Sequence, residues 1–379
     1  MKASWIISAL VAVANLAAGC AIEPGLHLKK AVKTEVLLVT EVNVDMVWQI
    51  NWKATWDFNW DVQVLGTLGY QLPASMCLHI YGLNSEGELY NHSEHNFVGT
   101  SSFVDVPVGV YNLLFYNNDS EALLFTSADD LADIFCYTRT ISTGLKDSEP
   151  IYTPQQKAAG LTKADDLSSE PVSLPPEGLF SMYDQNFFIT DDPKDLVFED
   201  GRYILKVEGE LDPSTYIYLI QVKLLNNNGR VVGSAGGGAI TGMAGGVNLM
   251  SREALENTVS VPMDVYMDRD QDMLGAKVFS FGLPGCNAYD KASVKAAPEH
   301  THYLVLNISY SNGTYRNIRA DITDQVRALP TGGVITLELD VEDFPPIEGG
   351  GGGGGEGDGG FNALIDDWKE ETGSITIIN

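Results

Sequence analysis

Apolar and polar residues alternate along the stretch Val36–Val64, which reads VLLVTEVNVDMVWQINWKATWDFNWDVQV. Its even-numbered positions are almost all apolar, whereas its odd-numbered positions from Glu41 onward are almost all polar. A period of two is the signature of a half-buried β-strand. The stretch is longer than an ordinary strand, so we expect it to fold over at least once, at Asn51–Thr55 or at Asp57–Asp61.

Within this stretch, one face carries Trp48, Trp52, Trp56 and Trp60, which are four of the six tryptophans in the chain. Two interpretations remain open. The four rings pack in a core or on a sheet face, or some of them form an exposed platform on which a ligand such as a sugar stacks. Burial of this face would decide between the two interpretations.

Shorter apolar or alternating runs, separated by turn residues, continue through most of the chain. The predicted strands are 76–81, 103–117 with a turn at 107–109, 203–207, 215–225, 258–265, 276–281, 303–310 and 334–341. Helical patterns are scarce, and the two short candidates are 127–134 and 322–328. Many short strands at close spacing predict an all-β protein with two antiparallel β-sandwich domains in tandem. We place the domains at residues 34–190, which include a long connecting segment, and at residues 191–346.

The last part of the chain, residues 347–379, has an unusual composition. Gly349–Gly355 is unbroken glycine, which predicts a flexible tether. The tether is followed by a short predicted strand, made of Ser374, Ile375, Thr376, Ile377 and Ile378. Such a strand can fold back onto its own sheet or pair with an exposed sheet edge of another molecule, and we keep it as a candidate donor strand.

The first twenty residues, MKASWIISALVAVANLAAGC, have the pattern of an export signal. Lys2 precedes an apolar segment that is too short to span a membrane, and small residues lead to Cys20. Small residues ending in cysteine resemble a bacterial lipoprotein signal, in which Cys20 is lipidated and residues 1–19 are removed. An ordinary secretory signal with a chance cysteine is the alternative. In the lipoprotein interpretation, residues 20–33 form a linker between the lipid and the first domain.

Charge and cysteine content bear on the possible partners and on disulfide pairing. The chain has 23 Lys and Arg against 51 Asp and Glu, for a net charge of -28, so we expect no nucleic-acid partner. Three cysteines remain besides Cys20, and an odd number cannot all pair. Cys77 and Cys136 lie in strand-like runs and are either a disulfide or two buried thiols.

Motifs that carry catalytic or metal chemistry are incomplete. The glycine-rich stretch Gly233–Gly246 lacks the lysine of a P-loop, and we interpret its glycines as bulges or turns. His92–His95 has the wrong spacing for a zinc motif, His300–His302 lacks an evident third ligand, and Asp268–Asp272 lacks the glycine and glutamate of a calcium loop. We therefore expect no enzyme, no metal and no cofactor.

Several stretches, in order, resemble the fimbrillin-like lipoproteins of Bacteroides-type bacteria, a family of pilus anchor and accessory subunits. The stretches that carry the resemblance are the Cys20 signal, the early strand run with its tryptophans, Leu72–Tyr90, Val104–Asp119, Gly236–Leu249, Phe279–Gly282, Asp366–Trp368 and Ile375–Ile377. The resemblance implies two transthyretin-like β-sandwich domains, export as an outer-membrane lipoprotein, and a role in surface fimbriae as anchor, tip or accessory subunit.

In polymerising members of that family, a protease cuts after an arginine in the N-terminal segment and removes the first strand. The first arginine here is Arg139, inside the first domain, so we expect this chain to keep its first strand and to act as an anchor. The segment Ala21–Gly25 lacks the acidic cluster associated with surface export in these bacteria, so membrane attachment is better founded than surface display.

Two hypotheses of function follow. The first is a lipid-anchored structural subunit that joins other fimbrial subunits by β-strand complementation in cell adhesion and is held in the membrane through Cys20. The second is a cell-surface lipoprotein that binds a glycan or another host surface ligand on its tryptophans.

Overall fold

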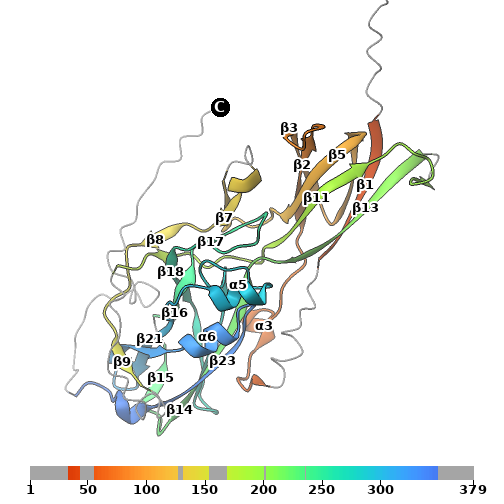
Figure 1. Cartoon of the computed structure of the whole chain (residues 1–379). Helices are drawn as coiled ribbons and strands as arrows, with labels where there is room; N and C mark the ends of the chain where they lie inside the picture. The colour runs from red at the N-terminus through yellow and green to blue at the C-terminus, as the bar shows by residue number, and fades with distance from the viewer. Residues whose placement is uncertain are drawn as a thin grey trace, which may run out of the picture.

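The computed structural model describes residues 33–42, 55–126, 131–152, 169–199, 202–234 and 236–348. These residues are mostly β-strand, as the sequence predicts, and most strand pairs are antiparallel (Figure 1). Within this part of the chain, no helix is both long enough and apolar enough to cross a membrane.

The first region of the structure is built on one eight-stranded sheet. Its strands are β1 (Lys33–Val42), β2 (Ser75–Leu83), β3 (Leu89–Val98), β4 (Ser101–Pro107), β5 (Gly109–Asn117), β11 (Phe180–Ile189), β12 (Val197–Glu199) and β13 (Arg202–Pro213). They follow the order β3-β2-β5-β11-β13-β1-β4, and β12 pairs with β13. The sheet encloses a core that includes Met76, Leu78, Leu113, Phe115 and Leu211.

The second region is a sandwich of two sheets. The larger sheet contains β8 (Thr140–Ser142), β9 (Glu149–Ile151), β10 (Val172–Ser173), β15 (Val231–Gly233), β16 (Gly238–Ala244), β18 (Thr258–Met263), β21 (Tyr303–Tyr310) and β22 (Tyr315–Asp321). The smaller sheet has the order β19-β20-β14-β23, from β14 (Tyr216–Leu225), β19 (Val265–Asp268), β20 (Met273–Ser280) and β23 (Gly333–Asp340). The core between the sheets includes Tyr218, Ile220 and Val222 of β14 and Leu304 and Leu306 of β21.

Smaller elements complete the described chain. A three-stranded sheet contains β6 (Leu124–Phe125), β7 (Phe135–Tyr137) and β17 (Gly246–Asn248). The helices are α3 (Val62–Leu65), α5 (Lys291–Ala296), α6 (Thr323–Ala328) and the 3-10 turns η1 (Leu131–Asp133) and η2 (Val341–Asp343).

The strand predictions between residues 76 and 341 are confirmed, because each falls on an observed strand or on a consecutive pair of strands. The turn predicted at 107–109 separates β4 from β5, and the helix predicted at 322–328 is α6. The glycine-rich stretch contains a bulge, as expected. Gly242 has a φ of +71°, and the register of β16 against β18 shifts between Ile240 and Met243.

The predicted strand over residues 56–64 is wrong. Residues 56–61 are not paired in a sheet, and Val62–Leu65 forms the short helix α3, which Asp61 caps by accepting a hydrogen bond from the Gln63 backbone. The alternation is nevertheless real. Trp56, Phe58 and Trp60 are half-buried, buried and half-buried, whereas the residues between them are exposed.

The chain crosses between the two regions more often than the expected boundary at residues 190–191 implies. β13 lies beyond that boundary, yet it pairs with β1 and β11 of the first sheet. Strands β8, β9 and β10 lie before the boundary, yet they pair within the larger sheet of the second region. Long-range pairing therefore mixes the two segments that composition separates.

Candidate functional site: the first strand and the junction of the two regions

The first strand, β1, lies inside the eight-stranded sheet rather than at its edge. It pairs in parallel with β13 over eight positions, from Glu35 opposite Ile204 to Val42 opposite Leu211. On its other side it pairs antiparallel with β4 over seven positions, from Lys33 opposite Pro107 to Val39 opposite Ser101. Along the strand order of this sheet, β1 alone joins β4 to β13. Its removal would expose two facing strand edges, and this geometry accepts an extended segment from another chain.

A second extended segment, residues 55–60, lies on the smaller sheet of the second region. Its backbone is held by the buried amide of Gln221, whose Oε1 accepts hydrogen bonds from Asp57 N at 2.8 Å and Phe58 N at 3.3 Å. The Nε2 of Gln221 donates to Thr55 O at 2.7 Å and to Thr336 Oγ1 at 2.9 Å. One side chain thus satisfies three backbone groups that a neighbouring strand would otherwise pair.

The aromatic rings of this segment pack directly on the smaller sheet, and one of them contacts the sheet backbone at a glycine. Phe58 lies over Gly275, where an added Cβ would come within 2.5 Å of the ring. Trp60 makes an edge-to-face contact with Tyr266 at 5.6 Å between ring centroids, and its Nε1 donates to Gly66 O at 2.9 Å. Glycine at position 275 is required because the ring occupies the space that a side chain would fill.

These contacts bear on the predicted tryptophan platform. The ring planes of Trp56 and Trp60 are inclined by 61°, and both side chains pack against the core of the first region. The two rings therefore do not form a coplanar exposed surface. Trp48 and Trp52 lie outside the described residues, so the platform stays a prediction for those two positions.

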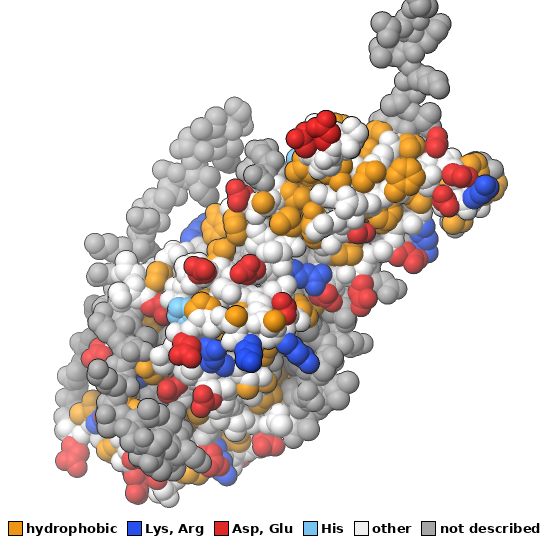
Figure 2. Space-filling model, viewed as in Figure 1, with side chains coloured by type: hydrophobic (Ala, Val, Ile, Leu, Met, Phe, Trp, Pro, Cys, Tyr) orange, Lys and Arg blue, Asp and Glu red, His pale blue; other side chains and the backbone are white. Residues whose placement is uncertain are grey.

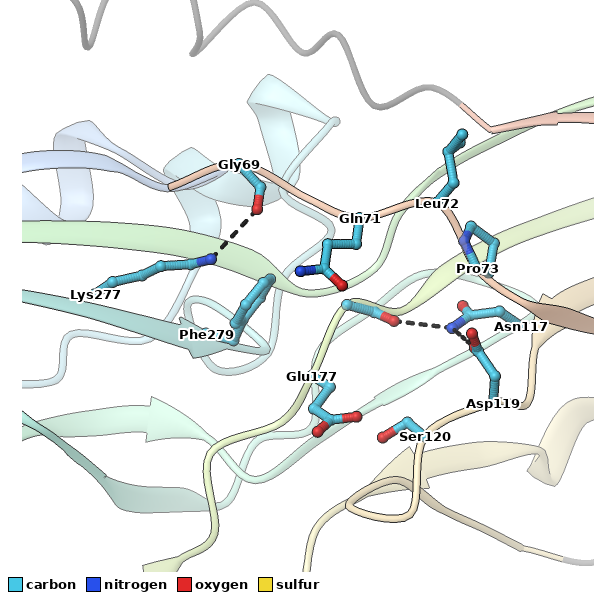
Figure 3. Close-up of a pocket in the computed structure, with 11 residues that line it drawn as sticks. Gly69, Gln71, Leu72, Pro73, Asn117, Asp119, Ser120, Glu177, Lys277 and Phe279 are labelled. Atoms are coloured by element: carbon cyan, nitrogen blue, oxygen red, sulfur yellow. Dashed lines mark hydrogen bonds between the residues drawn. The ribbon is translucent and has the colours of Figure 1, made fainter. Parts of the chain in front are cut away.

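A cavity of about 280 Å³ lies at the junction of the two regions (Figure 3). It is lined by Gly69, Gln71, Leu72, Pro73, Asn117, Asp119, Ser120, Glu177, Gly178, Lys277 and Phe279. Lys277 Nζ donates to Thr67 O at 2.8 Å and to Gly69 O at 3.3 Å, and it lies 4.8 Å from the centroid of Phe279. Burial lowers the pKa of Lys277 to about 8.

The polar groups on the opposite wall of the cavity are bonded to one another. Asn117 Nδ2 donates to Asp119 Oδ1 and to Gly178 O, both at 2.9 Å, and Asn117 Oδ1 accepts from Phe180 N at 2.7 Å. Asn117 thus ties β5 to the turn before β11 and positions Asp119. We therefore interpret the cavity as a gap within a hydrogen-bonded contact between the two regions.

A histidine cluster lies on β2, β3 and β5. His79 Nδ1 is 2.8 Å from His92 Nε2, and His79 Nε2 is 2.8 Å from the Tyr116 hydroxyl and 3.3 Å from Cys77 Sγ. Burial lowers the pKa of His79 to about 4, so the ring is neutral at pH 7. The His92–His95 motif lies in the exposed strand β3.

Of the described residues, no group of three or more His, Cys, Asp and Glu is arranged to hold a metal ion. His302 is buried and lies near Thr241 O, whereas Asp268 caps the turn after β19 by accepting from the backbone of Asp270 and Gln271. Cys77, Cys136 and Cys286 are buried free thiols. The thiol alternative for Cys77 and Cys136 is therefore correct, and they form no disulfide.

The remaining predicted site residues, Cys20 and Ser374–Ile378, lie outside the described residues. Sequence reasoning missed Gln221 and Lys277, which hold the 55–70 segment on the second region. Each is a polar residue within a mostly apolar strand, Gln221 in β14 and Lys277 in β20. That exception to the pattern is a usable signal, because a polar side chain buried in a strand needs a partner.

Comparison with solved structures returns proteins of low sequence identity to this chain. A candidate adhesin from Bacteroides ovatus has a TM-score of 0.48 and 14% identity, covering 82% of this chain and 93% of that one. The fimbrial anchor protein Mfa2 from Porphyromonas gingivalis has a TM-score of 0.41 and 12% identity, covering 81% and 91%. A candidate polysaccharide-binding protein from Bacteroides thetaiotaomicron has a TM-score of 0.38 and 8% identity, covering 80% and 90%. No curated protein matches the sequence.

These neighbours include fimbrial anchor and adhesin proteins of Bacteroides and Porphyromonas, the group that the sequence motifs resemble. The fold and the inserted first strand define the class as an all-β protein of two linked regions. The chain belongs to the family described as a domain of unknown function, DUF5119, whose model matches residues 55–264.

Proposed function

We propose that this protein is a lipid-anchored, fimbrial-type structural subunit of the cell surface that acts as an anchor in cell adhesion and assembles by β-strand complementation. The observation that carries the proposal is the position of β1, paired on both sides within its own sheet. A chain that keeps this strand has its own acceptor groove filled. It therefore takes part in assembly as a donor.

The donor segment in this proposal is Ser374–Ile378. Its sequence alternates so that Ile375 and Ile377 share one face and Thr376 lies on the other. A donor strand adds affinity through its backbone hydrogen bonds, and its inward side chains fill pockets of the acceptor groove. Glycine-rich linkers behave as flexible chains, and the proposal assigns this role to the run Gly349–Gly355, which precedes the strand in the sequence.

Membrane attachment in this proposal rests on the Cys20 signal.

The location of Arg139 agrees with retention of β1. Arg139 is exposed between β7 and β8, and its carbonyl accepts a hydrogen bond from Leu174 N at 2.9 Å. A trypsin-like cut at this point would break the chain between β7 and β8, far from β1 in the sequence, and would not remove β1 from its own sheet.

The test uses the full-length protein isolated from its native envelope and run on a denaturing gel with and without boiling. We expect a heat-sensitive ladder, which Ile375→Asp combined with Ile377→Asp abolishes. The matched control, Thr376→Asp, adds a charge on the opposite face and should keep the ladder. A single monomer band from the unmodified protein, or a ladder that survives the double substitution, would contradict donation by this strand. Cys20→Ser tests the anchor separately, since it should release the protein from the membrane fraction.

A further inference from the structure

One end of the eight-stranded sheet exposes large apolar side chains. The exposed fractions are 45% for Leu89, 58% for Tyr90, 37% for Val108, 57% for Phe188, 51% for Val197 and 63% for Phe198. Strand register places them at the same end of the sheet. The β2–β3 hairpin, the β4–β5 turn, the end of β11 and the β12–β13 hairpin all lie at this end. We call these six residues the apolar end, and Figure 2 shows hydrophobic side chains gathered over this part of the molecule.

The same end receives the N-terminal chain. β1 begins at Lys33, which lies opposite Pro107 beside the β4–β5 turn. Cys20 precedes Lys33 by thirteen residues, and thirteen residues span at most roughly 45 Å when fully extended. A lipid on Cys20 therefore keeps the apolar end within a short distance of the bilayer. Such a tether raises the effective concentration of a weak membrane contact.

The composition of the apolar end specifies the kind of surface it fits. Tyr90, Phe188 and Phe198 are aromatic, and aromatic side chains concentrate at the boundary between headgroups and hydrocarbon. Among the side chains that the structure describes at this end, the exposed charges are mainly carboxylates, of Glu86, Glu88, Asp191, Asp192 and Asp195, with Lys194 among them. Carboxylates at this end would be repelled by anionic lipid, so the favoured surface has no net charge.

We infer that the apolar end inserts its side chains into the headgroup boundary of a zwitterionic bilayer, an inference that rests on the proposed lipid anchor at Cys20. Exposed apolar patches of this kind mark interaction sites. When the lipid and the apolar end both contact the membrane, the end of the first region at which β1 begins faces the bilayer. The second region points away from it.

The test reconstitutes the full-length lipidated protein in phosphatidylcholine vesicles. Val197→Cys introduces a labelling site at the apolar end, and Tyr315→Cys introduces a control site in β22, where Tyr315 is 62% exposed. Cys77, Cys136 and Cys286 are buried and should not react with an environment-sensitive fluorophore. We expect a several-fold rise and a blue shift of emission at position 197, with quenching by lipids that carry a nitroxide near the headgroup, and no change at position 315. Adding phosphatidylglycerol should reduce the signal at position 197.

A water-like emission at position 197 in vesicles would overturn the inference. Protection of that position only after fimbrial proteins are added would also overturn it, because the apolar end would then be a protein interface. Failure of the anchor itself gives a different result. The protein without added cysteine would then take up label at Cys20 and would not remain with the vesicles.

Discussion

At the scale of single residues, the alternation of Trp56, Phe58 and Trp60 shows what the sequence predicts and what it cannot. Every second side chain of this segment turns toward the sheet, as in a strand. Its hydrogen-bond partners are the side chains of Gln221 and Gln271 instead of a neighbouring backbone. A period of two reports an extended chain on an apolar surface. It carries no information about which groups satisfy the backbone.

Replacing Gln221 with leucine should lower the free energy of unfolding by about 2–3 kcal/mol, because the buried or partly buried hydrogen bonds to the backbone of Thr55, Asp57 and Phe58 are lost. Urea unfolding measures the change. Gln325→Leu is the matched control, since Gln325 also bonds both backbone groups of Thr336 but at an exposed position. We expect the control to cost less than about 1 kcal/mol. Equal losses in the two variants would show that the burial of Gln221 has no special role.

His302 predicts a pH dependence of stability. Burial is the main cause that lowers the pKa of His302 to about 4, and the charges of His300 and Arg327 also lower it. The Thr241 carbonyl and Asp321 raise the pKa, but their effect is smaller than that of burial. The unfolded chain therefore binds a proton that the folded chain does not between about pH 6.5 and pH 4. The stability that this residue contributes is present above about pH 6.5 and is lost as the pH falls toward 4.

His302→Asn should remove this contribution, because the asparagine amide can still donate to Thr241 O but does not titrate. Between pH 7 and pH 4, the free energy of unfolding should fall by up to about 3 kcal/mol less in this variant than in the unmodified protein. His300→Asn, two residues away and less buried, serves as the control. A pH profile of His302→Asn that runs parallel to that of the unmodified protein would contradict the assignment.

At the scale of elements, β1 and β14 differ in how far the sequence determines their place. β14 has both faces buried, Tyr218 and Ile220 toward the core of the second region and Ile217 and Leu219 toward the junction. Its continuous apolar sequence is typical of such a strand, and its prediction is confirmed. The partners of β1 are β13 and β4, about 170 and 65 residues away along the chain. Because hydrophobic pattern does not specify strand order, the insertion of β1 between them could not be predicted.

Deleting the chain up to residue 42 should reduce stability by about 3–5 kcal/mol, since β1 pairs on both sides and each cross-strand pair contributes a fraction of a kcal/mol. A synthetic peptide of Lys33–Val42 should bind the shortened chain and raise its melting temperature. Calorimetry with increasing peptide measures both effects. A scrambled peptide of the same composition should have no effect, and binding of the scrambled peptide would show that the groove does not select the sequence of β1.

At the scale of the whole molecule, the two regions are joined by more than a linker. Segment 55–70 and strands β8, β9 and β10 come from the first part of the sequence but pack on the second region. The sequence predicts a long connecting segment within residues 34–190, but contacts between distant segments decide which region it completes. For this reason the all-β class was predictable and the allocation of chain segments to the sheets was not.

A fragment of residues 191–346 should therefore fail to fold as an independent domain. It lacks three strands of the larger sheet, and the junction face of β14 with Ile217 and Leu219 would be exposed. We expect a fragment of residues 33–348, which keeps these partners, to unfold cooperatively in calorimetry, and the shorter fragment to show no transition or to aggregate. A cooperative transition of the shorter fragment would show that the crossing segments are dispensable.

The direction of β1 has a consequence for how the protein bears mechanical load. A pull on the lipid would enter the chain at Lys33 and run along the strand axis, while the rest of the molecule resists from the opposite end of the sheet. The bonds that join β1 to β13 and β4 lie across this axis, so the load would be shared among them as shear. Strand ends that peel open one bond at a time yield at lower force. The proposed anchor thus places a strand that is paired on both sides where tension from the fimbria would meet the membrane.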